Sequence, residues 1–155
     1  MHAKFMRRAI ELSRQHMQKN AGGPFGAVVV RDGKIIGEGW NKVTSNSDPT
    51  AHAEVEAIRE ACRNLKAFDL SGAEIYTSCE PCPMCLAAIY WARVDRIYFG
   101  NSRQDAAQIH FDDDLIYGEI SKKMSDRKIK MTQLLHEEAN QVFSEWEMKT
   151  DKVRY

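Results

Sequence analysis

Residues 79–85 read Cys-Glu-Pro-Cys-Pro-Met-Cys, so three of the four cysteines, Cys79, Cys82 and Cys85, follow one another at intervals of three. In a reducing compartment such a cluster favours a metal site or a catalytic thiol over disulfides. The prolines form a turn that opens a helix, which places Cys82 and Cys85 on its first turn. Two thiols at this spacing face one ion, and the helix dipole lowers their pKa. The stretch therefore predicts a metal site at a helix N-terminus.

His52 supplies a third donor, about 30 residues upstream, at the start of another predicted helix. Three protein ligands, His52, Cys82 and Cys85, leave the fourth tetrahedral position open, which is typical of a catalytic zinc. If Cys79 also bound, the site would be a closed structural zinc, but we expect Cys79 at a strand end before the turn. Glu54 diverges from His52 by about 200° on a regular helix, so we expect it to carry protons for an activated water rather than bind the metal.

Helices alternate with strands along the rest of the chain. The first half of the chain predicts a helix that ends at residues 20–24, strands 25–30 and 35–40 joined by an Asp-Gly turn, and a helix over 51–65. Thr50 is expected to cap this last helix, and Val55, Ile58 and Cys62 are expected on its inner face. The second half predicts a strand 74–78, a helix to about Trp91, a strand 96–100, a short helix 111–120, a fifth strand 129–134 and a helix along Leu135–Trp146. This order predicts a three-layer α/β/α sandwich on a mixed five-stranded sheet.

Length and composition indicate one globular domain over residues 1–155, with 43% hydrophobic and 28% charged residues. Twenty-two basic residues balance twenty-two acidic ones, so the chain lacks the basic field that nucleic-acid binding usually needs. No apolar run approaches the length of a membrane span, and the first residues do not resemble a signal peptide. We therefore expect a cytoplasmic protein that acts neither on membranes nor on nucleic acid.

The motifs His-x-Glu at residues 52–54 and Pro-Cys-x-x-Cys at 81–85 resemble the zinc-deaminase signature of the cytidine deaminase-like superfamily. More narrowly, the chain resembles bacterial guanine deaminases along most of its length. The segments that carry this resemblance are 23–27, 48–54, 77–85, 89–93, 111–113 and the final Tyr155. The resemblance implies hydrolysis of guanine to xanthine and ammonia with one zinc per subunit. Glu54 would pass protons between the attacking water, the purine ring and the departing amine.

The same resemblance implies which residues hold the base. Asn41 pairs with the purine edge, although an asparagine in a turn explains it equally well. Phe25 stacks on the ring or fills the core. Asp113 contacts guanine or carries a second proton, although acidic triplets commonly cap helices. Tyr155 closes the site of a partner subunit, because the segment of about 136–155 is exchanged in a homodimer of this family.

Two other classes of function stay open. A deaminase of the same fold would act on guanosine, cytosine or adenosine in a transfer RNA. Guanosine needs room for a ribose where Tyr155 is expected, and the zero net charge weighs against RNA. A non-enzymatic module stabilised by structural zinc is the more distant alternative, and in it Glu54 would have no role.

Overall fold

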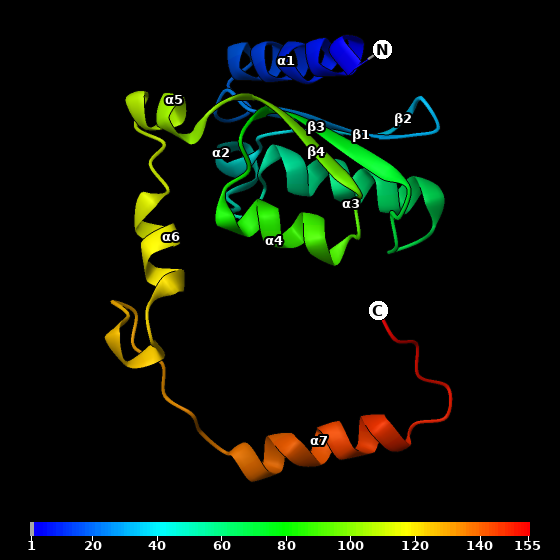
Figure 1. Ribbon diagram of the computed structural model, residues 1–155, viewed down its shortest axis with the longest axis vertical. Helices are drawn as coiled ribbons and strands as arrows, with labels where there is room; N and C mark the ends of the chain where they lie inside the picture. Colours follow the sequence, from blue (N-terminus) through cyan, green and yellow to red (C-terminus); the bar gives the residue numbers. More distant parts are fainter. Residues whose placement is uncertain (1) are drawn as a thin grey trace. The chain divides into compact units, whose positions relative to one another are not determined.

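A mixed four-stranded sheet forms the centre of the chain up to Asp114 (Figure 1). Its strands are β1 (Gly26–Arg31), β2 (Lys34–Trp40), β3 (Ala73–Cys79) and β4 (Arg96–Asn101). Their order in space is β2-β1-β3-β4, with β1 antiparallel to both neighbours and β3 parallel to β4. Asp32 and Gly33 join β1 to β2 with φ of 51° and 72°, the positive values that a tight hairpin needs. The predicted hairpin is therefore confirmed.

Helices cover both faces of this sheet (Figure 1). Helix α1 (His2–Gln18) packs on β1 and β3 from one side, and α3 (Ala53–Leu65) packs on β2 and β1 from the other. Helix α4 (Pro83–Trp91) lies beside α3. Because α1, the sheet and the pair of helices form three layers, the predicted α/β/α sandwich is confirmed.

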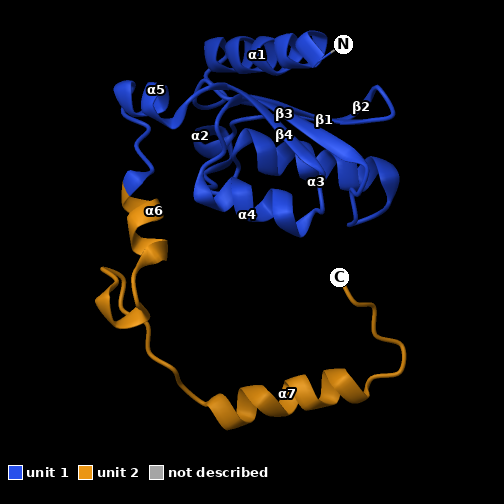
Figure 2. Ribbon diagram, in the orientation of Figure 1, with its two compact units in different colours: residues 1–114 blue, residues 115–155 orange. Residues whose placement is uncertain are grey.

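The structure describes residues 2–155, which form two compact units divided between Asp114 and Leu115 (Figure 2). The second unit contains most of α6 (Asp114–Ser121), a short 3-10 helix η1 (Met124–Asp126) and α7 (His136–Met148). Helix α7 confirms the helix predicted along residues 135–146. Among residues 2–155, no helix has both the length and the apolar character needed to cross a membrane.

The predicted fifth strand, residues 129–134, is wrong. This segment has no regular secondary structure, and the side chains of Ile129 and Leu134 are 81% and 79% exposed. An apolar β-branched pattern forms a strand only where a neighbouring strand supplies hydrogen bonds and buries one face. The sheet therefore has four strands rather than five.

Two helix starts also differ from prediction. Helix α3 begins at Ala53 with His52 as its N-cap, because the backbone N–H and hydroxyl of Thr50 both donate to Asp48 Oδ1, at 2.8 and 2.7 Å. Thr50 therefore closes an Asp turn instead of capping the helix. The helix predicted over 111–120 starts at Asp114.

The 3-10 helix η1 was not predicted, nor were two short α-helices, α2 (Val43–Asn46) and α5 (Arg103–Gln108). Neither contains enough turns to show an apolar period. A capping box does mark the start of α5, since Ser102 and Asp105 bond reciprocally through their side chains and backbone.

Candidate metal centre

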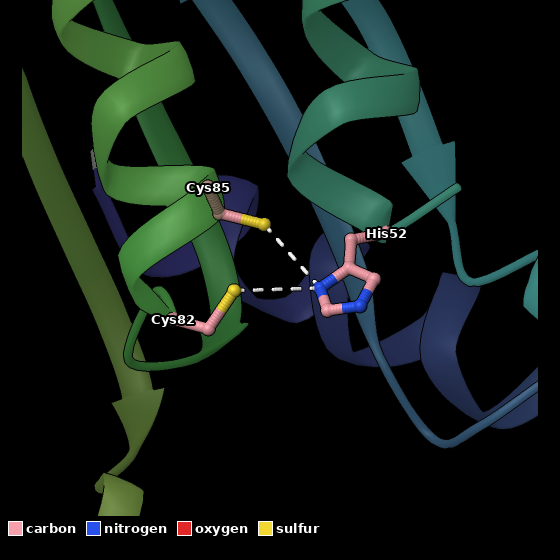
Figure 3. A group of neighbouring side chains, drawn as sticks. All are labelled: His52, Cys82 and Cys85. Atoms are coloured by element: carbon pink, nitrogen blue, oxygen red, sulfur yellow. Dashed lines mark hydrogen bonds between the residues drawn. The ribbon is translucent and has the colours of Figure 1, made fainter. Parts of the chain in front are cut away.

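Two helix N-termini bring the predicted metal ligands together (Figure 3). His52 is the N-cap of α3 and Cys82 is the N-cap of α4, while Cys85 lies on the first turn of α4. The Nδ1 atom of His52 lies 3.5 Å from the Sγ atoms of both Cys82 and Cys85. All three donor atoms lie within 4.8 Å of one another.

The spacing of these donor atoms fits a zinc ion. A tetrahedral zinc with ordinary bond lengths to nitrogen and sulfur holds these ligands about 3.6 Å apart. The hydrogen bond between the two thiols lowers the pKa of Cys82 to about 4 and raises that of Cys85, so the pair shares one proton. A divalent cation would replace this proton and satisfy both sulfurs.

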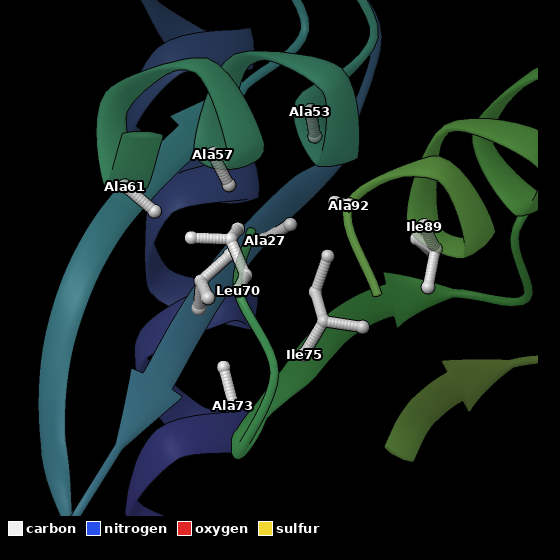
Figure 4. Packing of buried hydrophobic residues seen from close by; sticks show 10 residues of the cluster. Ala27, Ala53, Ala57, Ala61, Leu70, Ala73, Ile75, Ile89 and Ala92 are labelled. Carbon is white, nitrogen blue, oxygen red and sulfur yellow. The ribbon is translucent and has the colours of Figure 1, made fainter. Parts of the chain in front are cut away.

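Close packing of α3 against the sheet sets the position of His52. The fully buried side chains that α3 adds to the core are alanines, Ala53, Ala57 and Ala61 (Figure 4). A Cβ atom at Gly37 or Gly39 of β2 would collide with the backbone of this helix. The strand and the helix therefore approach more closely than larger side chains would allow.

This packing corrects the predicted inner face of α3. Val55, Ile58 and Cys62 are half-buried rather than central, and the latter two pack at the margin of the core. The prediction favoured large apolar residues, whereas the short distance between helix and strand admits only methyl groups.

Glu54 is buried beside the metal ligands, with 6% of its surface exposed. Its Oε1 accepts a hydrogen bond from Thr77 Oγ1 at 3.2 Å, and its Oε2 accepts one from Cys85 Sγ at 3.4 Å. Burial raises the pKa of Glu54, and the negative charge of Cys82 adds to that rise. A carboxylate with a raised pKa is suited to accept a proton and return it.

Thr77 is a further residue of the site, and no motif in the sequence singles it out. Its side chain lies in the middle of β3 and is 1% exposed. A buried hydroxyl requires a hydrogen-bond partner, and this requirement was the available signal. His52 lies before the first residue of α3, so the angle expected between His52 and Glu54 on a regular helix does not apply. The hydrogen bond from Thr77 holds the Glu54 carboxylate in place instead.

Cys79 lies outside the three-ligand cluster. Its Sγ donates to the backbone oxygen of Ser102 at 3.7 Å, and burial raises the pKa of its thiol to about 11. A protonated thiol that already donates a hydrogen bond is a poor metal ligand. This geometry favours an open site with three protein ligands.

We expect Cys79→Ser to retain a full equivalent of zinc, since serine preserves the hydrogen bond to Ser102. Metal analysis of the purified variant beside the wild type measures this directly. Loss of zinc in the variant would instead support a closed site with four protein ligands.

Asn41 is buried just after β2 and holds two loops together. Its Oδ1 accepts hydrogen bonds from the backbone N–H groups of Gly23 and Val43, both at 3.1 Å. Its own backbone N–H donates to the oxygen of Phe25 at 3.1 Å. Both side-chain bonds use the carbonyl end of the amide, which leaves the Nδ2 donor for a ligand.

Phe25 packs partly against the core and also contacts Phe111 edge-to-face, with ring centroids 4.9 Å apart at 87°.

Asp113, two residues after Phe111 along the chain, is half-buried and has a raised pKa, first because of burial and then because of the charge at Cys82. Its charge also raises the pKa of Cys79. Asp113 therefore lies within electrostatic range of the metal ligands.

The neighbours of Asp113 have other partners. Asp112 accepts a hydrogen bond from the backbone N–H of Asp114 at 2.9 Å, and Asp114 pairs with Arg103 at 2.9 Å. Tyr155 belongs to the second unit and is 72% exposed there.

Comparison with known proteins supports the chemistry of this site. A family model described as the cytidine and deoxycytidylate deaminase zinc-binding region matches residues 1–101. Guanine deaminase of Bacillus subtilis is 48% identical over 154 residues, which is 99% of each chain. A tRNA-specific adenosine deaminase of Haemophilus influenzae is 42% identical over 116 residues, covering 72% of this chain and 66% of that protein.

The fold agrees with these matches. The X-ray structure of the Bacillus subtilis guanine deaminase superposes with a TM-score of 0.97, covering 100% of this chain and 99% of that one. The family model contains both the His-x-Glu and the Pro-Cys-x-x-Cys segments, and the structure joins them at one point. The chain therefore belongs to the cytidine and deoxycytidylate deaminase family of zinc-binding proteins.

Proposed function

We propose that this protein hydrolyses guanine to xanthine and ammonia. The observation that carries the proposal is the extent of the similarity to the Bacillus subtilis guanine deaminase. The alignment with that guanine deaminase covers 154 residues and therefore includes the second unit as well as the sheet. The alignment with the tRNA-specific adenosine deaminase covers 116 residues and leaves part of the chain unmatched. The zinc-deaminase site is common to the family, so the additional matched segment favours guanine over the other amines.

His52, Cys82 and Cys85 would hold the zinc, and Glu54 would move the protons. When bound, zinc supplies the Lewis acidity that makes a water molecule nucleophilic near neutral pH. The Glu54 carboxylate accepts the proton that this water loses as its oxygen bonds to C2 of the purine. Glu54 delivers that proton to the ring nitrogen. It then takes the second proton from the hydroxyl now on C2 and passes it to the amino group, which leaves as ammonia while the C2 carbonyl of xanthine forms.

The proposal assigns base recognition to four residues. The Nδ2 of Asn41 would donate to the purine edge, and the ring of Phe25, steadied by Phe111, would contact the base. Asp113 would bind guanine or act as a second proton carrier, a role that its raised pKa supports. Tyr155 would close the site of a partner subunit over its substrate and exclude bulk water.

We further propose that residues 1–155 act as one domain whose segment of about 136–155 is exchanged between the subunits of a homodimer. Within the second unit, α7 leaves large apolar side chains exposed. The exposed fractions are 59% for Val142, 73% for Phe143 and 41% for Trp146. Burying these apolar side chains against another protein surface is favourable, and a second copy of the chain would supply that surface.

Deleting residues 150–155 is expected to raise the KM for guanine by about tenfold, because the tail would no longer contact the base. Steady-state kinetics on the truncated protein, with its melting temperature beside that of the wild type, measure this. Unchanged guanine kinetics in a folded truncated protein would remove the tail and Tyr155 from the site.

Ammonia release from a panel of amines tests the proposed function. The zinc-loaded protein is incubated with guanine, guanosine, cytosine and a transfer RNA that carries adenosine at its wobble position. We expect kcat/KM for guanine to exceed that for each of the others by at least about 10²-fold. A preference for another substrate would reassign the enzyme within its family, and no release from any of them would favour a structural zinc module.

A further inference from the structure

The loop that carries Asn41 is attached to α3 through its neighbour Lys42. The backbone N–H of Lys42 donates to the oxygen of Ala51 at 2.9 Å, and Nζ of the same residue lies 2.9 Å from Glu56 Oε2. Nζ also lies 4.5 Å from the centre of the Trp40 ring. Lys42 therefore connects the end of β2 to the first turn of α3.

Glu56 is buried, with only 9% of its surface exposed, and burial disfavours the charged form of its carboxylate. Its two oxygens bind separate cations, because Oε2 pairs with Lys42 while Oε1 accepts from Arg59 Nη1 at 2.7 Å. Burial alone would raise the pKa of Glu56, but these two partners hold it below its ordinary value. A paired carboxylate with little exposure is more strongly coupled to its partners than a surface ion pair.

The same carboxylate lies on the helix that carries the reaction chemistry. The backbone N–H of Glu56 donates to the backbone oxygen of His52 at 3.0 Å. Glu54 and Glu56 both lie on the first turn of α3. On the other side, a Cβ atom at Gly22 would collide with Oδ1 and the carbonyl of Asn41. Asn41 therefore lies between Gly22 on one side and Lys42, which is paired with Glu56, on the other.

We propose that Glu56 is a positioning residue that, through Lys42, fixes the Asn41 amide relative to the metal ligands and so sets the affinity for the base. This inference rests on the proposed function, because it takes Asn41 as the group that reads the purine edge. Glu56 itself contacts neither the base nor the metal. Its loss should therefore weaken substrate binding and leave the metal and the proton transfer in place.

The test compares Glu56→Gln, Lys42→Met and their double variant with the wild type, all with measured zinc content. Lys42→Met keeps an unbranched chain beside Trp40 and removes the ammonium group that contacts both Glu56 and the ring. We expect each single variant to raise the KM for guanine about tenfold with kcat changed by less than about twofold. The double variant should be no worse than either single one, because both remove the same ion pair.

Arg59→Met is the matched control. It removes the other partner of Glu56 and leaves the Lys42 pair in place, so it should lower the melting temperature without changing KM. Should Glu56→Gln not fold, Lys42→Met carries the test, because its side chain is 27% exposed.

Three results would overturn the inference. The first is an unchanged KM in Lys42→Met, the second is an additive loss in the double variant, and the third is a fall in kcat with KM intact. A wild type that deaminates no base refutes the proposed function itself. An active wild type whose variants keep the normal KM refutes only the role of Glu56.

Discussion

Glu54→Gln is expected to lower kcat for guanine by at least about 10³-fold while the protein keeps its zinc and its fold. Glutamine has nearly the same shape and still accepts a hydrogen bond from Thr77, but its amide cannot take a proton from water. The carboxylate is buried and bonded on both oxygens, so no bulk water replaces it. Single-turnover kinetics with guanine, combined with zinc analysis, separate the loss of proton transfer from loss of the metal.

Glu60→Gln is the control for this experiment. Glu60 lies on the same helix, and its carboxylate accepts a bond from the backbone N–H of Glu38, which a glutamine oxygen can also accept. Its activity should be close to that of the wild type. Turnover near the normal rate in Glu54→Gln would exclude Glu54 as the proton carrier.

Cys82→Ala should reduce bound zinc to below about a tenth of an equivalent per chain and abolish turnover. A site with three protein ligands that loses a thiolate keeps only two, too few to hold zinc against dilution. Cys82 is also the thiol whose pKa falls to about 4, so it is the anionic member of the pair before any metal binds. Elemental analysis after gel filtration in chelator-free buffer gives the metal content.

Loss of zinc should also lower the melting temperature, because a ligand bound only by the folded state stabilises that state. Cys62→Ala is the control, since Cys62 is half-buried against the core and lies outside the ligand cluster. It should keep its zinc. Undiminished zinc in Cys82→Ala would require a different ligand set.

The metal-site residues were predictable because their signal is local. Cys82 and Cys85 share one helical turn, and the adjacent prolines mark where that turn begins. The hairpin at Asp32 and Gly33 was predictable for a similar reason, since two neighbouring residues determine its turn type.

The fifth strand was not predictable in the same way. Residues 129–134 have the composition of a strand, but a strand also needs a neighbour, and that neighbour is distant in sequence. The inner face of α3 was also misjudged. Alanine is the right size at Ala57 only because Gly37 and Gly39 lie opposite it on another element.

The sequence by itself therefore determined the ligand types, the turn that presents Cys82 and Cys85, and the hairpin, because each depends on interactions within a few residues. Tertiary structure alone decided that Thr77 holds the Glu54 carboxylate and that the Cys79 thiol donates to Ser102. These outcomes depend on which surfaces pack together and which polar groups lose water. Packing and desolvation join residues that are far apart in the chain, so no local pattern encodes them.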